Sequence, residues 1–416
     1  MALFSPETWP FSLNLLPDDT YLVGGSVRDR LLKRSAAYLD LDFVLSSNAV
    51  KTAATIANTY NAGFVVLDEA RQIARVVFAE MTVDFAQQQG ETIAVDLQRR
   101  DFTINAIAYH PTTHQLIDPL GGEADIAHKI LRMVSYENLA ADPLRLMRGY
   151  RQAAQLKFTL STETQLAIRQ LAPLLAEVSS ERVHSELDAL LSIPAGSDYL
   201  ASMLENRLLQ FCLPHFDSDR VKQIKAVDGA IAQFQSQMPD YAERLKSWLK
   251  PAPAGHYRSW IKAVKLSRMV GAKPKQAEAE LVDLKYSRSE IQTVTTLLEA
   301  QPDIDAMIQG QFTQAQQFFL FKAAGDCFPA VSLLALSQGV PLSLIQPMIE
   351  RFLNPDDAIA HVQTLITGRT LMKQLKLKPG PQIGQILKAV EQAQADGRVK
   401  DEESAIAFVF SIFDDS

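Results

Sequence analysis

The sequence predicts an α+β fold in which a small domain with a mixed sheet is followed by an all-helical remainder. The chain has 416 residues, too many for one ordinary hydrophobic core, so we expect two to four domains. Strand-like and helix-like segments alternate over roughly the first 120 residues. Beyond about Ala140, apolar residues recur at spacings of three and four, as they do on amphipathic helices.

The first region combines short apolar strands with two helical stretches. We expect strands at Tyr21–Val23, Leu39–Leu45, Gly63–Leu67, Ile73–Phe78, Thr82–Ala86 and Gln115–Asp118. The fourth and fifth are expected to form a hairpin with its turn at Ala79–Met81. The expected helices are Val27–Lys33 and Ala49–Tyr60. This alternation is typical of a small mixed α/β domain.

The remainder is expected to be helical to its end, with breaks at prolines. The first expected helices are Leu144–Leu156, Thr162–Leu171, Arg182–Leu191 and Ser197–Glu205. Further breaks are expected at Pro251-Ala252-Pro253, Lys273-Pro274, Pro302, Pro341, Pro355 and Pro379-Gly380-Pro381. These patterns divide the chain into domains 1–140, 141–215, 216–350 and 351–416.

Composition favours a soluble, cytoplasmic protein without a membrane partner. Hydrophobic residues make up 47% of the chain and charged residues 21%, as in ordinary globular proteins. The N-terminal stretch has no basic residue before its apolar part and contains Pro6 and Pro10, so it does not resemble a secretory signal. Cys212 and Cys327 lie far apart without metal-ligand spacing, which favours buried thiols in a reducing compartment.

The formal net charge of −7 does not by itself indicate a nucleic-acid binder, but the charge is uneven. The stretch Tyr257–Gln276 contains six basic residues and no acid, and Gly368–Lys400 contains seven basic residues against two acids. In the first stretch, Arg258, Lys262 and Lys265 recur at spacings that place them on one helix face. Such a face is either a solubilising surface or a local contact for phosphates.

The tripeptide Asp40-Leu41-Asp42 lies within an expected strand. Residues two apart on a strand project from the same face, so we expect both acids on one face. Two adjacent carboxylates repel each other, and a divalent cation such as Mg²⁺ removes that conflict. Asp84 lies between apolar residues on another expected strand. Three carboxylates from two adjacent strands can hold two Mg²⁺ ions. The alternative is that these acids simply face water.

The segment Gly24-Gly25-Ser26-Val27-Arg28-Asp29 follows a strand and begins a helix. Two glycines allow a ligand to approach the backbone closely, and a helix N-terminus presents free N–H groups to an anion. Ser26 and Arg28 add a hydroxyl and a positive charge. Ordinary turn chemistry is the alternative. A phosphate-binding turn followed by metal-binding acids is the order that a triphosphate-using transferase needs.

Two later segments combine arginines with hydrogen-bonding side chains. In Arg99–Ala106, the arginines, Arg100 among them, can hold phosphate oxygens, while Asp101 and Asn105 can hydrogen-bond a ribose. The alternative is a helix N-terminus with a solvated basic edge. In the second segment, Asp142 is the expected N-cap and Pro143 the first turn of a helix. On that helix the basic side chains continue along one face at Arg145, Arg148 and Arg151.

Together these segments resemble the class II tRNA nucleotidyltransferase/poly(A) polymerase family. The matches are GGSVRD at 24–29, DLD at 40–42, RRDFTINAIAY at 99–109, IDPLGG at 117–122, DPLRLMR at 142–148 and ERVHSEL at 181–187. They follow the order and spacing of the family and cover roughly the first 190 residues. The stretch 368–387 also resembles the C-terminal part of long bacterial members.

The resemblance implies a template-independent nucleotidyltransferase with a catalytic head at 1–140, a nucleobase-reading neck at 141–215, an RNA-binding body at 216–350 and a tRNA-binding tail at 351–416. It implies the tRNA 3′ end as partner, CTP and ATP as substrates, and two Mg²⁺ ions. No stable protein partner is indicated. The basic residues expected to contact RNA are Arg258, Lys262, Lys265, Lys373 and Lys376.

The resemblance also implies roles for single residues. Asp40, Asp42 and Asp84 would hold the metal ions and form the catalytic site. Nucleotide binding would fall to Gly24, Gly25, Ser26, Arg28, Arg100, Asp101, Asn105, Asp142, Arg145, Arg148 and Arg151.

Base selection has a physical basis in this resemblance. Cytosine and adenine each place an amino donor beside a ring-nitrogen acceptor, to which Asp142 and Arg145 are complementary. Uracil and guanine reverse this pattern and would leave buried polar groups unpaired, at about 1–3 kcal/mol each. Arg182, from a later helix, can hold this pair in place.

Two departures from the family pattern affect the expected product. Ala141 stands where the family usually has Glu before the neck aspartate. Because of this replacement, we expect Asp142 and Arg145 to keep reading the base but to be held less rigidly. Only fourteen residues, Phe85–Gln98, separate Asp84 from Arg99, whereas full CCA-adding members carry a longer loop there. The shorter loop resembles members that add only the two cytidines. The working hypothesis is CC addition, with full CCA addition as the alternative left open.

Two further hypotheses belong to other classes. A poly(A) polymerase shares the head motifs, but the chain lacks a strongly basic C-terminal extension. A non-catalytic RNA-binding relative would not need the intact acids at Asp40, Asp42 and Asp84.

Overall fold

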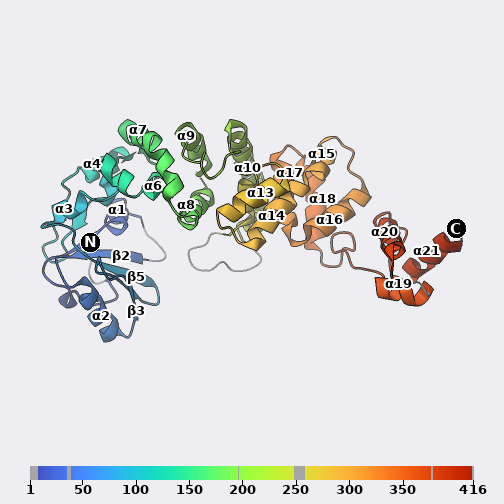
Figure 1. The fold of residues 1–416 in the computed structure, drawn as a ribbon, viewed down its shortest axis with the longest axis horizontal. Helices are drawn as coiled ribbons and strands as arrows, with labels where there is room; N and C mark the ends of the chain where they lie inside the picture. The colour runs from blue at the N-terminus through green and yellow to red at the C-terminus, as the bar shows by residue number, and fades with distance from the viewer. Residues whose placement is uncertain (1–7, 35–38, 195, 248–257, 376–377, 415–416) are drawn as a thin grey trace. The chain divides into compact units, whose positions relative to one another are not determined.

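The computed structural model describes all residues except 1–7, 35–38, 195, 248–257, 376–377 and 415–416. The chain divides into two compact units, Met1–Phe211 and Cys212–Ser416 (Figure 1). The first unit carries the sheet and the second is helical throughout its described residues. The predicted fold class, a mixed-sheet domain followed by helices, is therefore confirmed.

In the described part of unit 1, seven strands form one mixed sheet in the order β3-β4-β5-β2-β1-β6-β7. The β2–β5 pair is parallel and the other neighbours are antiparallel. The strands are β1 Thr20–Val23, β2 Leu39–Leu45, β3 Gly63–Asp68, β4 Ile73–Val77, β5 Met81–Gln87, β6 Ala108–Tyr109 and β7 Leu116–Ile117. The expected hairpin is β4–β5, closed by the Phe78 N–H donating to the Met81 carbonyl at 2.9 Å.

The alternation of β2 separates its core side chains from its acids. Leu41, Phe43 and Leu45 are buried in a cluster with the apolar face of α2 (Ala49–Tyr60). Since side chains alternate along a strand, Asp40 and Asp42 project from the opposite face. Figure 1 shows α2 lying beside β3 in unit 1. The hydrophobic pattern of one strand thus fixes the direction of its two carboxylates.

Helices complete unit 1. They are α1 Gly25–Leu31, α2, α3 Ile93–Leu97, α4 Gly122–His128, α5 Tyr136–Ala141, α6 Leu144–Leu156, α7 Thr162–Leu171, α8 Ser180–Ser192 and α9 Leu200–Glu205, with 3-10 turns at Leu13–Leu15, Thr103–Asn105, Ala172–Glu177 and Gly196–Tyr199. Contrary to the expectation of helix alone beyond residue 140, the short strand β9 (Thr159–Leu160) pairs in parallel with β8 (Ile130–Leu131).

A close contact joins α6 to the segment that follows Arg100. A Cβ built on Gly149 would lie 2.9 Å from the ring of Phe102, which is fully buried. The absence of a side chain at Gly149 therefore lets α6 lie directly against this ring. This packing fixes α6 against the segment that contains Phe102.

Unit 2 is built from helices α10 Ser218–Gln237, α11 Pro239–Leu245, α12 Trp260–Ser267, α13 Pro274–Asp283, α14 Arg288–Glu299, α15 Gln301–Ile308, α16 Gln314–Ala324, α17 Phe328–Ser337, α18 Leu342–Leu353, α19 Gly368–Leu375, α20 Pro381–Ala395 and α21 Glu402–Asp414, with a 3-10 turn at Gly325–Cys327. Expected breaks coincide with helix starts at Pro274 and Pro381 and with the N-cap Pro341. The break expected at Pro251-Ala252-Pro253 lies outside the described residues.

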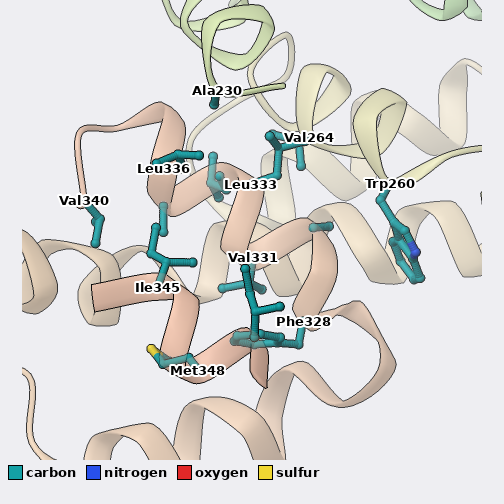
Figure 2. Packing of buried hydrophobic residues seen from close by; sticks show 14 of the residues in the cluster. Ala230, Trp260, Val264, Phe328, Val331, Leu333, Leu336, Val340, Ile345 and Met348 are labelled. Carbon is teal, nitrogen blue, oxygen red and sulfur yellow. The ribbon is translucent and has the colours of Figure 1, made fainter. Parts of the chain in front are cut away.

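The core of unit 2 is centred on α17, whose apolar side chains are buried on all sides (Figure 2). Phe328, Val331 and Leu333 pack there with Trp260 and Val264 of α12. A second cluster joins α19, α20 and α21. Among the described residues, one stretch, Gln314–Ser337, has the length and hydropathy of a membrane span, but 67% of its apolar window is buried inside the protein. Burial of this kind is typical of a core helix.

Candidate active site

A cavity of about 460 Å³ in unit 1 collects all of the predicted metal-binding and nucleotide-binding residues except Asp84. Its walls come from the turn before α1, from β2, from the segment 100–105, and from α6. The predicted residues that line it are Gly24, Gly25, Ser26, Arg28, Asp40, Asp42, Arg100, Asp101, Asn105, Asp142, Arg145, Arg148 and Arg151. Segments far apart in sequence therefore meet at one site.

Asp40 and Asp42 present their carboxylates to this cavity. Asp40 is exposed and accepts a hydrogen bond from Thr82 Oγ1 at 2.5 Å. Burial and the negative charge of Asp40 raise the pKa of Asp42 to about 6, although Arg100 opposes the shift. Two like charges and partial burial disfavour the ionised pair, and a divalent cation would reverse that penalty. The donor set of hard oxygens fits Mg²⁺.

Asp84 lies opposite Asp42 in the parallel register of β2 and β5. Its carboxylate accepts two hydrogen bonds from Arg75 of β4, from Nε at 2.7 Å and from Nη2 at 2.8 Å. Asp84 still contributes to the raised pKa of Asp42, so it is electrostatically part of the cluster. It does not line the cavity, and the sequence did not indicate Arg75 as its partner. A metal-binding role for Asp84 stays a prediction.

The glycine turn lies directly against the acids. Gly24 has a φ of +76°, which side-chain-bearing residues rarely adopt. A Cβ there would lie 3.1 Å from Asp42 Oδ2 and 3.3 Å from Arg100 Nη1. The hydroxyl of Ser26 donates to the Val23 carbonyl at 3.0 Å, so it stabilises the turn in this structure. The turn thus brings backbone, carboxylate and guanidinium together.

A buried network holds the floor of the cavity. Arg28, only 6% exposed, donates through Nη1 to Asn105 Oδ1 at 2.8 Å. Asn105 in turn donates to Asp101 Oδ1 and Gln152 Oε1, each at 2.9 Å. Arg148 Nε lies 3.2 Å from Asp101 Oδ2. Each polar group is fixed by the next, which preorganises the arginines.

The charges in this network are shifted by their surroundings. Burial lowers the pKa of Arg28, although Asp29 opposes the shift. Burial disfavours the charged form of Asp101, but Arg148, the Asn105 amide and the Phe102 N–H outweigh it, and the pKa of Asp101 is lowered. Asp101 is therefore an anion that orients arginines.

The neck residues form a separate charged cluster at the start of α6. Arg182 Nη2 donates to both carboxylate oxygens of Asp142 at 3.2 Å, and Arg145 Nε lies 3.9 Å from Asp142 Oδ2. Arg145 Nη1 also donates to the Arg99 carbonyl at 3.1 Å. The expectation that Asp142 caps α6 is wrong. Pro143 occupies the N-cap and no side chain caps this helix, so the Asp142 carboxylate is available to Arg182 and to the cavity.

Six lining residues were not predicted as site residues: Asp29, Arg30, Arg34, Leu41, Gln152 and Gln155. The last two continue the face of α6 that carries Arg148 and Arg151 at spacings of four, so the periodicity of that helix would have indicated them. Arg151 Nε is paired with Glu186 Oε2 at 2.5 Å. Nothing in the sequence pattern alone separates Arg30 and Arg34 from ordinary surface arginines.

The predicted basic face in unit 2 is corrected by the structure. Lys262 and Lys265 are 2% and 1% exposed. Lys262 Nζ lies 2.8 Å from Glu290 Oε1, and Lys265 Nζ lies 2.6 Å from Asp228 Oδ1. Arg258 precedes α12 and lies 3.8 Å from Glu290. These charges are neutralised inside unit 2, because acids from other helices meet them, and they form no exposed face for RNA.

The two tail residues have different outcomes. Lys373 is exposed on α19, and its contact with RNA stays a prediction. Lys376 lies outside the described residues.

Comparison with known families and relatives agrees with this geometry. Residues 20–132 match the family described as "Poly A polymerase head domain", residues 157–220 match "Probable RNA and SrmB- binding site of polymerase A", and residues 259–409 match "tRNA nucleotidyltransferase domain 2 putative". The fold and the site therefore define a nucleotidyltransferase of the poly(A) polymerase head type.

Relatives extend the match over nearly the whole chain. A "CC-adding tRNA nucleotidyltransferase" of Synechocystis sp. is 43% identical over 96% of this chain and 95% of its own length. A protein of the same description from Geobacter sulfurreducens is 30% identical over 91% of this chain and 89% of its own. An "A-adding tRNA nucleotidyltransferase" of Deinococcus radiodurans is also 30% identical, over 94% of this chain and 95% of its own. The chain belongs to the tRNA nucleotidyltransferase/poly(A) polymerase family. The three relatives named above are enzymes of this family.

Solved structures share the fold. The Thermotoga maritima CCA-adding enzyme complexed with tRNA superposes with a TM-score of 0.68 at 20% identity, over 95% of this chain and 91% of that one. A CCA-adding enzyme with ATP gives 0.71 and one with CTP gives 0.70, each over 95% of this chain and 91% of that one, at 20% and 21% identity.

Proposed function

We propose that this protein is a cytoplasmic, template-independent tRNA nucleotidyltransferase that adds CMP from CTP to the tRNA 3′ end. The observation that carries the proposal is the single cavity in which two strand carboxylates, a glycine turn and a charged pair at the start of α6 meet. The printed activities of the Synechocystis and Geobacter relatives support the same reaction.

Asp40 and Asp42, with Asp84 beside them, would hold two Mg²⁺ ions. When bound, these ions lower the pKa of the attacking 3′ hydroxyl and stabilise the leaving oxygen. The chain's own residues position the nucleotide. Arg28, held by Asn105, and Arg100 provide guanidinium donors for phosphate oxygens, and the Gly24 turn leaves room for the triphosphate to approach the backbone.

Asp142 and Arg145 would read the base. Arg182 donates to both carboxylate oxygens of Asp142 and so fixes the orientation of that carboxylate. This contact would compensate for Ala141, which stands where the family usually carries a glutamate. A fixed acceptor beside a fixed donor favours cytosine and adenine over uracil and guanine. The pair alone does not distinguish CTP from ATP.

The segment between Asp84 and Arg99 supports CC addition as the product. It consists of the end of β5, a short connection and α3, whose N-terminus is capped by the Thr92 hydroxyl. This leaves little chain for a long flexible loop. Sequence identity alone does not decide the product, because relatives that add CC, A and CCA match at about 30%.

The test uses purified protein with CTP or ATP supplied separately, on tRNA lacking CCA and on tRNA ending in CC. We expect addition of two cytidines to the first substrate and no AMP on the second. Efficient AMP addition to tRNA ending in CC would replace this proposal with full CCA addition. A long adenylate tract on a generic RNA would instead indicate a poly(A) polymerase.

A further inference from the structure

Arg268 differs from the other buried cations of α12. Lys262 and Lys265 on the helix and Arg268 at its C-cap recur at spacings of three. All three are buried, and Arg268 is 8% exposed. The two lysines each have an acid within 2.8 Å, Glu290 and Asp228. Among the described residues, no acid forms a salt bridge with Arg268.

The guanidinium of Arg268 is incompletely satisfied. Its Nε donates to Ser267 Oγ at 3.2 Å, while Nη2 is buried without a hydrogen-bond partner in the described structure. Burial, together with the positive charge of Arg220, lowers the pKa of Arg268 to about 10. A buried charge without a counter-charge costs free energy. Among the described residues, no carboxylate offsets this cost by a salt bridge with Arg268.

Arg268 lines two cavities of unit 2, of about 190 Å³ and 520 Å³, which share Gln223 and Gln301 as further lining residues. Arg220 of α10 lines the smaller cavity and donates through Nη1 to the Arg268 carbonyl at 3.3 Å. Gln223 is exposed, so the smaller cavity opens to solvent. Two guanidinium groups thus lie beside a solvent-accessible space with amide donors.

Two acids, Asp217 and Asp219, also line the smaller cavity. Asp217 caps α10 by accepting the Arg220 N–H at 2.9 Å, and Asp219 pairs with Lys222 at 2.8 Å. Three helices, α12, α14 and α17, end at these cavities and two, α10 and α15, begin there, so helix dipoles do not supply a positive field. Over the two cavities the lining contains three cations, Arg220, Lys222 and Arg268, against these two acids, so the net charge favours an anion.

We propose that the cavity at Arg268 and Arg220 binds a backbone phosphate of the tRNA. Guanidinium donors match phosphate oxygens in geometry and charge. The proposal rests on the proposed function and names a contact for RNA on unit 2. It moves that contact from Lys262 and Lys265, which are already neutralised, to Arg268, a buried cation of the same basic stretch for which the described residues provide no acid. A free phosphate ion has the same chemistry, so the experiment separates the two sources.

The test compares wild type with Arg268→Met, which keeps an unbranched side chain and removes the charge. We expect about tenfold weaker binding of tRNA lacking CCA. The slope of log affinity against log salt should fall in magnitude by about 0.7–0.9. The KM for CTP and the kcat at saturating tRNA should not change. The thermal midpoint should stay equal or rise, because an unpaired buried charge is lost, whereas a structural role would lower it.

Arg288→Met is the matched control, because Arg288 is exposed on α14 and lines neither cavity. It should change tRNA affinity less than about twofold, as expected for an isolated surface charge. Arg220→Gln is the second variant, should Arg268→Met fail to fold, and should also weaken binding and the salt slope. Wild-type affinity and slope in the folded cavity variants would overturn the proposal.

A measurement with inorganic phosphate distinguishes a site for a tRNA backbone phosphate from a site for a free phosphate ion. If phosphate raises the thermal midpoint of wild type more than that of Arg268→Met while tRNA affinity is equal in both, the site takes a free anion and the RNA proposal is overturned. If wild type binds tRNA but adds no CMP, the proposed reaction fails while the binding comparison still tests this cavity.

Discussion

At the scale of single residues, the carboxylate of Asp42 lies in surroundings that disfavour its ionised form. Its carboxylate is partly buried beside Asp40, and both factors raise its pKa to about 6. The ionised side chain therefore destabilises the metal-free protein at neutral pH. Function, rather than folding, accounts for an acid at this position.

Asp42→Asn should accordingly separate stability from activity. In the absence of divalent cations we expect its thermal midpoint to equal or exceed that of wild type, because a like-charge repulsion is removed. CMP addition should fall by roughly 10²–10³-fold or more, as when one preorganised electrostatic contact is lost. Mg²⁺ should raise the midpoint of wild type but not of the variant. A variant with wild-type activity would contradict the metal assignment.

Gly24→Ala tests the close approach of the turn. The left-handed backbone should cost of order 1–3 kcal/mol, and the new Cβ would crowd Asp42 and Arg100. We expect a lower midpoint and a higher KM for CTP. Gly121→Ala is the control, since Gly121 also has a positive φ of +71° but no atom within 4 Å of its added Cβ. It should lose stability without a change in KM, and equal effects on KM in both variants would refute the crowding argument.

At the scale of elements, long and strongly periodic segments were predicted closely and pairings were not. The bounds of β2, α2, α6 and α7 match the expectation, because alternation or helical periodicity runs through each whole element. Strands of two residues, such as β6 and β9, are too short to show alternation. The acids that meet Lys262 and Lys265 come from α14 and α10, and tertiary packing alone decides that.

The candidate site was predictable where its residues lie in ordered motifs, and its internal contacts were not. The turn, the strand acids and the face of α6 each carry a local signal. The pairing of Asp84 with Arg75 depends on which strand lies beside β5, which a single sequence does not reveal.

The buried pair between α12 and α14 should make stability depend on pH. The pKa of Glu290 is lowered, because Lys262 and Ser287 favour its ionised form more than burial disfavours it. A lowered pKa contributes stability above the ordinary carboxyl value, and this is lost as pH falls through the lower folded value. Glu290→Gln should lose about 3–5 kcal/mol at pH 7, since Lys262 is left unpaired, and less in acid.

Denaturant unfolding between pH 3 and 7 measures this difference. Glu391→Gln is the control, because the pair of Glu391 with Lys322 is largely exposed and should contribute about 0–1 kcal/mol. A loss at Glu290 that is small and independent of pH would contradict the role of the pair.

At the scale of the whole molecule, each unit has its own core and the candidate site lies within one of them. The cavity residues all belong to unit 1, whose sheet is buried independently of the helical clusters of unit 2. A fragment ending at Phe211 should therefore fold and bind CTP, measured by calorimetry, within about tenfold of the full chain. It should lose tRNA affinity. A fragment that folds but no longer binds CTP would show that unit 2 completes the site.

The packing of Gly149 on Phe102 has a consequence for what the site accepts. One rigid helix carries side chains from Arg145 to Gln155 along the cavity, a run of about 15 Å. We expect this helix to fix the distance between Arg145, the proposed contact of the base, and the proposed phosphate contacts at Arg28 and Arg100 on the other walls of the cavity. Analogues that lengthen the link between base and sugar should be refused even when both ends are chemically correct.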